Sequence, residues 1–122
     1  MAVTKGVVAN ALADTLVTDT TTDSTAEANV TGASGTMYYV YIDNTANTTA
    51  AYVKIADATS ATSSSTVPDF VFYAPASKAV SYAVPSGAGY GQGLSVWGTS
   101  TQASAVSQTD PGTAVTVRIL ST

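Results

Sequence analysis

The sequence predicts an all-β fold, an antiparallel β-sandwich or barrel, on the strength of two observations. Short runs rich in aromatic and β-branched residues recur along the chain, and such side chains suit a pleated, half-buried surface. Clusters of Pro, Gly, Asn and Ser separate these runs and are typical of turns between strands. At 122 residues, the expected organisation is one domain built from these strands.

The densest strand signal covers residues 37–57, which read MYYVYIDNTANTTAAYVKIAD. Strands are expected at residues 35–43 and 50–58, and the polar loop 44–49 between them favours an antiparallel hairpin. Alternation in the second strand would put one set of side chains on one face, namely Ala51, Val53 and Ile55. The opposite face would carry Tyr52, Lys54 and Ala56, which is typical of a strand buried on one side only.

Further strands are expected at residues 67–74, 79–84, 94–99 and 113–120. In the strand that begins at Leu94, Leu94 and Val96 would share one face and Trp97 would lie on the other. The stretch 85–93, PSGAGYGQG, is expected to be a loop in which glycines supply positive φ angles.

Residues 1–34 are expected to form an N-terminal arm with a possible first strand, ahead of a sandwich domain at residues 35–122. Apolar residues recur in the arm at intervals of three and four, a spacing that also suits a short amphipathic helix; they are Val7, Val8, Ala11, Leu12 and Leu16. The following tract, TDTTTDST, is a poor helix former. We therefore favour an arm plus one strand, ordered against a neighbouring molecule.

The composition excludes several kinds of chemistry. The chain has no His and no Cys, and so lacks the commonest general base, thiol nucleophiles and the usual zinc ligands. No two carboxylates are placed by the sequence as an acid–base pair. We expect no catalytic residue, no cofactor and no metal site, and hence no enzyme.

Charge is equally informative about partners. Four Lys and Arg residues stand against eight acids, for a net charge of −4. So few cations cannot neutralise a run of phosphates, which argues against binding to nucleic acid or to an anionic membrane.

The aromatic residues suggest a binding surface. Seven Tyr and one Trp are more than one small core holds, and Tyr and Trp are enriched at protein interfaces. Packing between the sheets, an oligomer or partner interface, and a sugar platform all remain open for them. The candidate interface residues are Val7, Val8, Leu12, Leu16, Tyr39, Tyr73, Tyr90 and Trp97.

The stretch 52–120 resembles small capsid decoration (cement) proteins of tailed phages. The resemblance lies in the order of four pieces: AYVKIAD, TVPDFVFYAPAS, VSYAVPSGAGYGQGLSVWGTS and the closing VTVRIL. It implies a jelly-roll β-sandwich of about seven or eight strands that sits on a capsid, often as a trimer. No motif within these pieces marks functional residues.

From this resemblance we expect a structural virion protein, assembled in the host cytoplasm and located on the capsid surface. It would bind the major capsid protein and stabilise the shell by bridging its subunits, as a homo-oligomer for which a trimer is favoured. The alternative is a receptor- or glycan-binding module of a head or tail fibre. That alternative predicts an aromatic cluster exposed on the surface of the sandwich.

Overall fold

The structure is a computed structural model that describes residues 2–7, 13–102 and 109–122, and these residues form β-strands and no helix. The strands are β1 (Val3–Val7), β2 (Thr15–Thr22), β3 (Gly35–Asp43), β4 (Ala51–Asp57), β5 (Phe70–Ala74), β6 (Ala79–Tyr90), β7 (Leu94–Thr99) and β8 (Val115–Ser121). This confirms the all-β fold class, with antiparallel strands throughout.

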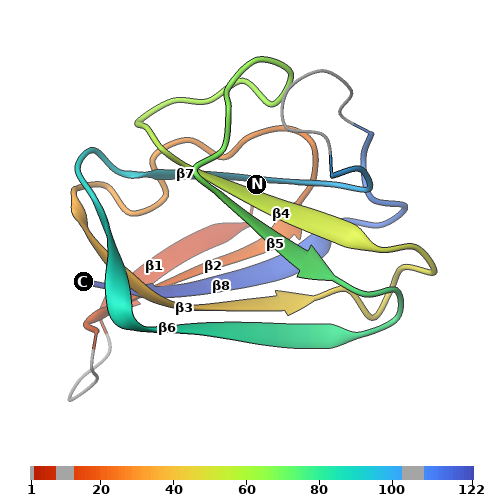
Figure 1. The fold of residues 1–122 in the computed structure, drawn as a ribbon, viewed down its shortest axis with the longest axis horizontal. Helices are drawn as coiled ribbons and strands as arrows, with labels where there is room; N and C mark the ends of the chain where they lie inside the picture. The colour runs from red at the N-terminus through yellow and green to blue at the C-terminus, as the bar shows by residue number, and fades with distance from the viewer. Residues whose placement is uncertain (1, 8–12, 103–108) are drawn as a thin grey trace.

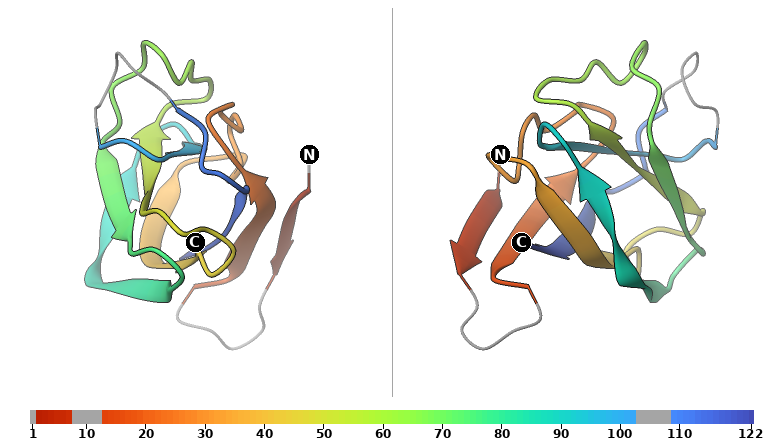
Figure 2. Two further views of the ribbon diagram at one scale, coloured as in Figure 1. Left: turned by 90° about the vertical axis from the view of Figure 1, so that its right-hand side faces the viewer. Right: turned by 60° about the vertical axis from the view of Figure 1, so that its left-hand side comes forward.

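The strands form two sheets that face each other (Figures 1 and 2). The larger sheet has the order β1-β2-β8-β3-β6, and the smaller sheet has the order β5-β4-β7. Residues 23–31, which we call the edge segment, run along the free side of β7. Glu27 pairs with Val96 in an antiparallel bridge, and the amide of Val30 donates to the carbonyl of Leu94 at 2.7 Å. The edge segment therefore continues the smaller sheet beyond β7.

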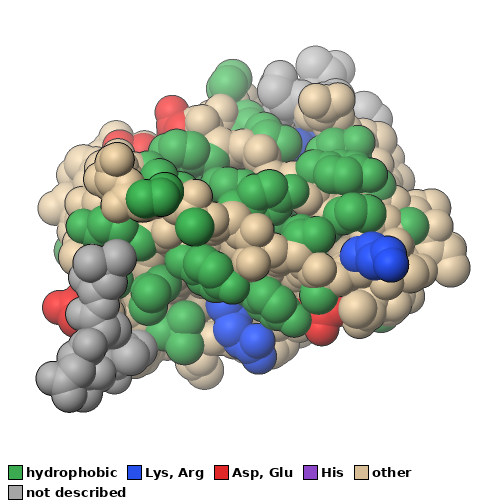
Figure 3. All heavy atoms as spheres, turned by 60° about the horizontal axis from the view of Figure 1, so that its bottom comes forward, with side chains coloured by type: hydrophobic (Ala, Val, Ile, Leu, Met, Phe, Trp, Pro, Cys, Tyr) green, Lys and Arg blue, Asp and Glu red, His purple; other side chains and the backbone are tan. Residues whose placement is uncertain are grey.

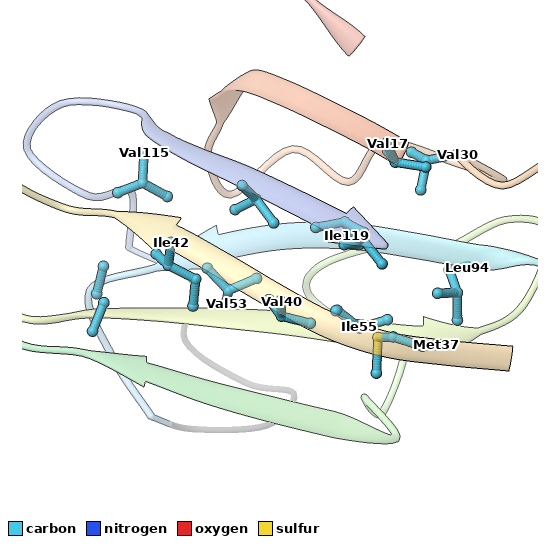
Figure 4. Packing of buried hydrophobic residues seen from close by; sticks show 14 of the residues in the cluster. Val17, Val30, Met37, Val40, Ile42, Val53, Ile55, Leu94, Val115 and Ile119 are labelled. Atoms are coloured by element: carbon cyan, nitrogen blue, oxygen red, sulfur yellow. The ribbon is translucent and has the colours of Figure 1, made fainter. Parts of the chain in front are cut away.

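The hydrophobic core lies between the sheets and consists mainly of Val and Ile (Figure 4). The fully buried aliphatic side chains come from facing strands of the two sheets and include Val40, Ile42, Val53, Ile55, Val96 and Ile119. Burying one such side chain contributes about 1.5–3 kcal/mol to folding. Alternation along β3, β4 and β8 is what places these residues on the inner faces.

The predicted hairpin between β3 and β4 is wrong, because the two strands lie in different sheets. β3 pairs with β6 and β8, whereas β4 pairs with β5 and β7. The physical reason is that both strands carry an apolar inner face, and these faces are buried by packing across the core. The connecting loop crosses from one sheet to the other through Asn44, a fully buried residue.

Asn44 and Asn47 form what we call the amide corner. Asn44 Nδ2 donates to the carbonyls of Thr49 at 3.0 Å and Pro75 at 3.0 Å, and its Oδ1 accepts from Asn47 Nδ2 at 2.8 Å. Asn47 Nδ2 also donates to the carbonyl of Thr113 at 2.7 Å. Two buried amides thus tie together the β3–β4 loop, the β5–β6 turn and the approach to β8.

The glycine-rich stretch is not a simple loop, because β6 continues through it to Tyr90. Ala83 pairs with Tyr39 and Ala88 pairs with Met37, so residues 84–87 bulge opposite Tyr38 alone. The prediction of positive φ is confirmed at Gly87, whose φ is 76°. A Cβ at Gly87 would lie 2.9 Å from the Tyr38 ring, so this position also needs glycine for space.

The prediction that β4 is buried on one side only is wrong. Lys54 and Ala56 on its outer face are as buried as the core side chains, and Trp97 on the neighbouring β7 is fully buried on the same side. Trp97 does lie on the face opposite Leu94 and Val96, as alternation predicts. The loop after β4 folds onto this face, where Ser95 Oγ donates to the carbonyl of Ala58 at 2.7 Å. Burial lowers the pKa of Lys54.

The N-terminal zone forms strands of the larger sheet where it is described. Leu16 lies in β2, so the alternative of a helix through this residue is wrong, and Val17 is part of the core. β1 pairs with β2, and β2 pairs with β8. The sheet is therefore continuous across the expected boundary at residue 34. The remainder of the possible helix, residues 8–12, lies outside the described residues.

Candidate functional site

The structure separates the candidate interface residues into three groups. Leu16, Tyr39 and Tyr73 keep part of their surface accessible, whereas Tyr90 and Trp97 are buried inside the chain. Burial removes Tyr90 and Trp97 from any surface of the single chain, which corrects their choice as interface anchors. Of the remaining candidates, Val7 is described only through its backbone in β1; those outside the described residues are Val8 and Leu12.

Two of the accessible candidates, Leu16 and Tyr39, lie in one row on the outer face of the larger sheet, on either side of Leu120. In the strand register, Leu16 pairs with Leu120, Leu120 with Tyr39, and Tyr39 with Ala83. The alternate residues in these strands point into the core, so the four paired residues point outward. We call this line across β2, β8, β3 and β6 the outer apolar row. Its register brings together residues from both ends of the chain.

The charges beside the outer apolar row are largely engaged. The Arg118 guanidinium carbon lies 5.3 Å from the centroid of the Tyr41 ring, a cation–π arrangement. Hydrogen bonds from the Thr45 hydroxyl and amide lower the pKa of Asp43, and the charge of Arg118 adds to this effect. Figure 3, which turns the underside of Figure 1 forward, shows hydrophobic side chains gathered across this side with few charged groups. The face is thus suited to apolar rather than ionic contacts.

A second apolar surface lies at β5, the open edge of the smaller sheet. Val71 and Tyr73 point outward and are 43% and 46% exposed, while the preceding Val67 is 67% exposed. The intervening Phe70 and Phe72 turn inward and pack half-buried against the core. We call these residues, together with Tyr82 of β6, the β5 edge surface.

The aromatic rings of this region form a connected cluster. The centroids of Phe72 and Tyr82 are 5.3 Å apart, and those of Phe70 and Phe72 are 6.4 Å apart. On the outer face, the ring of Tyr52 lies 5.5 Å from that of Tyr73. The Tyr82 hydroxyl donates to the carbonyl of Tyr73, which shows that this carbonyl faces away from β4.

Sequence reasoning found two residues of the outer apolar row, Leu16 and Tyr39, and one residue of the β5 edge surface, Tyr73. Alternation in FVFYA could have indicated that Val71 and Tyr73 share a face, but not that β5 pairs on one side only. Leu120 was expected in the last strand, but its position between Leu16 and Tyr39 depends on a long-range register that no local pattern contains.

The carboxylates of the described residues act mainly as acceptors for backbone amides. Asp57 accepts from the amides of Gly91 and Gln92, each at 2.9 Å, and these bonds lower its pKa. Asp69 accepts from the amide of Asp57 at 2.7 Å, so the two acids are adjacent but each binds backbone. Burial, with the nearby charge of Asp19 adding to it, raises the pKa of Glu27.

Across residues 2–7, 13–102 and 109–122 there is no acidic group arranged for a metal ion and no enclosed pocket. The same residues contain no helix long and apolar enough to cross a membrane. The features available for recognition are the outer apolar row and the β5 edge surface.

Comparisons with protein-family models, curated proteins and solved structures found no match for this chain. The fold and its surfaces therefore define the class: a two-sheet, antiparallel all-β protein with one apolar sheet face and one apolar sheet edge.

Proposed function

We propose that this protein is a structural virion protein that binds the outer surface of a phage capsid and stabilises it by bridging major capsid protein subunits. The observation that carries the proposal is the outer apolar row, Leu16–Leu120–Tyr39–Ala83, on the broad face of the larger sheet. The resemblance of residues 52–120 to decoration proteins supplies the kind of partner. Bridging needs repeated complementary surfaces rather than a pocket.

The strand order supports a jelly-roll topology for this proposal. When the edge segment is counted as a strand, the smaller layer has the order edge segment, β7, β4, β5. It faces β2, β8, β3 and β6 of the larger sheet, and β1 is added outside β2. Two layers with these orders are what the double Greek-key winding of an eight-stranded jelly roll would produce, and this agreement supports the proposed topology.

The physical basis of binding would be burial of the apolar row against the shell. A specific interface buries about 800 Å² on each partner, which a sheet face can supply but a single loop cannot. Because Arg118 and Asp43 already interact within the chain, few charges would need a partner in the shell. Binding should therefore depend only weakly on salt concentration.

Electron microscopy of intact particles from the source lysate, labelled with an antibody against this protein, tests the location. Label spread over the heads supports decoration, and heads from which the protein has been removed should be more fragile. Label confined to tails or fibres overturns the decoration proposal. Absence of label from every particle, with the protein present in the lysate, overturns every virion role.

Variants of the outer apolar row test the surface. Leu120→Lys puts a charge at the centre of the row, and Ala83→Lys puts one at its exposed end. Both variants should weaken the affinity for stripped heads, measured by co-sedimentation, because each places a charge in an apolar interface. The expected loss is about tenfold or more, which corresponds to about 1.4 kcal/mol or more. Ser64→Lys, in the exposed loop after β4, is the matched control. If Ala83→Lys folds normally and binds like the control, the row is not the docking surface.

The second candidate function is receptor or glycan binding by a head or tail fibre. Its support is the exposed ring of Tyr73 beside Tyr52, because aromatic platforms stack on sugar rings. Tyr73→Ser should then abolish attachment of the purified protein to host cells, whereas Ala83→Lys should not affect it. The decoration proposal predicts that neither variant matters for host cells.

A further inference from the structure

The open edges of the two sheets are protected to different degrees. β1 carries Lys5 and Gly6, and β6 is interrupted by Pro85 and its bulge. The free side of β7 is occupied by the edge segment. Charges, prolines, bulges and covering segments are the devices that keep sheet edges from pairing with other chains. β5, with the sequence FVFYA, has none of these within the strand.

The side chains of β5 are also apolar on both faces. Val71 and Tyr73 are 43% and 46% exposed on the outer face. Phe70 and Phe72 lie at the rim of the core on the inner face, where they are only half-buried. An apolar strand that is left partly exposed on both sides marks an interaction site.

We propose that β5 pairs with β5 of a second copy of this chain, antiparallel and across a two-fold axis at Phe72. The smaller sheets of the two copies would join into one continuous sheet. Val71 would lie opposite Tyr73 of the second copy on the outer face, twice by symmetry. The inner faces would bring Phe72 against its own counterpart and extend the aromatic cluster across the axis.

The backbone geometry fits this register. The carbonyl of Tyr73 faces away from β4, since it accepts from the Tyr82 hydroxyl of the other sheet. Alternation in an antiparallel ladder then turns the backbone of Val71 to the same open side. Residues 71 and 73 are the pair that an axis at Phe72 places opposite each other, so their amides and carbonyls can exchange hydrogen bonds.

The absence of charge along β5 favours a second copy of this chain as the occupant. A two-fold axis brings charges on a strand close to their own counterparts, and like charges across a strand pair are destabilising. No residue from Phe70 to Ala74 is charged. Asp69, just before the strand, would lie opposite Pro75 of the second copy, and Lys78 lies beyond the turn. Self-pairing thus meets no like-charge contact along β5.

Tyr82 limits this pairing in the single chain. Its hydroxyl occupies the Tyr73 carbonyl that the second copy would use. Removing the hydroxyl in Tyr82→Phe leaves that carbonyl free while keeping the ring against Phe72. Tyr82→Phe should therefore self-associate several-fold more tightly than the natural chain, whereas loss of a purely structural tyrosine would only lower stability.

Analytical ultracentrifugation of the full chain over a wide concentration range tests the pairing. The natural chain should show a reversible monomer–dimer equilibrium, weakened about tenfold or more by the charge in Val71→Lys. Ser81→Lys, at an exposed position of β6, should leave the dimer unchanged. A monomer at every concentration, or an oligomer insensitive to Val71→Lys, overturns the proposal. Because no capsid is present, the result is independent of the proposed shell binding.

The register is tested by disulfide trapping, for which a chain without cysteine is well suited. An equimolar mixture of V71C and Y73C chains should give a disulfide-linked heterodimer under mild oxidation, since directly opposed residues are within reach of a disulfide. V67C mixed with Y73C is the control, because position 67 is exposed but lies outside the paired strand. Equal cross-linking in both mixtures would overturn the register.

Discussion

The amide corner and the β5 edge surface reverse the usual distribution of polar and apolar groups. At the corner, Asn44 and Asn47 are 0% and 4% exposed, and their side-chain amides hydrogen-bond to three separate segments. At the edge, Val71 and Tyr73 are apolar and 43% and 46% exposed. The corner therefore contributes to topology and stability, and the edge is left available for association.

This difference shows how a chain with few charges separates folding from binding. A buried, fully satisfied amide specifies one arrangement of loops, because any other arrangement leaves its donors unpaired at a cost of about 1–3 kcal/mol. An exposed apolar strand contributes little to the stability of the single chain. Its apolar side chains give favourable burial energy only when a partner covers them. Variants in the two regions should accordingly change different observables.

The largest effect is expected at the corner. Asn44→Ala removes an amide that donates to several carbonyls and leaves Asn47 without one partner, which should lower the free energy of unfolding by about 3 kcal/mol. Urea denaturation measures this change. Thr48→Ala, an exposed position in the same loop, should have almost no effect. A loss of similar size in Thr48→Ala would mean that the loop, rather than the buried amide, determines stability.

A somewhat smaller loss is expected in the bulge of β6. Gly87→Ala adds a Cβ close to Tyr38 at a residue whose φ is 76°, and the strain should cost about 2 kcal/mol. The matched control is Gly89→Ala, where a Cβ meets nothing within 4 Å. Thermal unfolding of both variants compares them. Equal melting temperatures of the two variants would show that the bulge can adjust to a Cβ at residue 87 without strain.

The positions of several strands after residue 34 could be predicted from sequence, because each depends on a local alternating pattern, whereas β1, β2 and the second half of β6 were not predicted. Residues 35–43 and 94–99 were predicted with the bounds that the structure has. The partners of the strands could not be predicted in this way. β8 inserts between β2 and β3, and the hairpin expected for β3 and β4 is replaced by a crossing between sheets.

The candidate surfaces were predictable only in part for the same reason. Tyr73 and Tyr39 were correctly placed on strands, but their exposure depends on which strands are edges and which faces are covered. Trp97 is of a residue type common among interface anchors, but it is fully buried on the outer face of the smaller sheet. Whether loops cover a sheet face depends on tertiary structure, so the alternating pattern of a strand cannot predict it.

A surface pair should contribute less to stability than either buried feature. Arg118→Gln removes the cation over the Tyr41 ring, and exposed pairs of this kind are worth about 0.5–1 kcal/mol. Lys78→Gln removes the same charge at an exposed turn position and serves as the control. Urea denaturation should separate the two variants by about that amount. If the two variants have the same free energy of unfolding, the contact between Arg118 and the Tyr41 ring does not contribute to stability.

The smallest effect is expected at Asp57, a half-buried counterpart of the amide corner. Its carboxylate also joins separate segments by accepting from the amides of Gly91 and Gln92, but water competes for these bonds. Because the folded state lowers the pKa of Asp57, the bonds stabilise fully above the unfolded pKa of about 3.9. This contribution is lost as the pH falls through the folded pKa. Unfolding measured against pH should thus show a shallower acid dependence in Asp57→Asn than in the natural chain. An unchanged slope would mean that the bonds from Gly91 and Gln92 to the Asp57 carboxylate contribute nothing measurable to the stability of the fold.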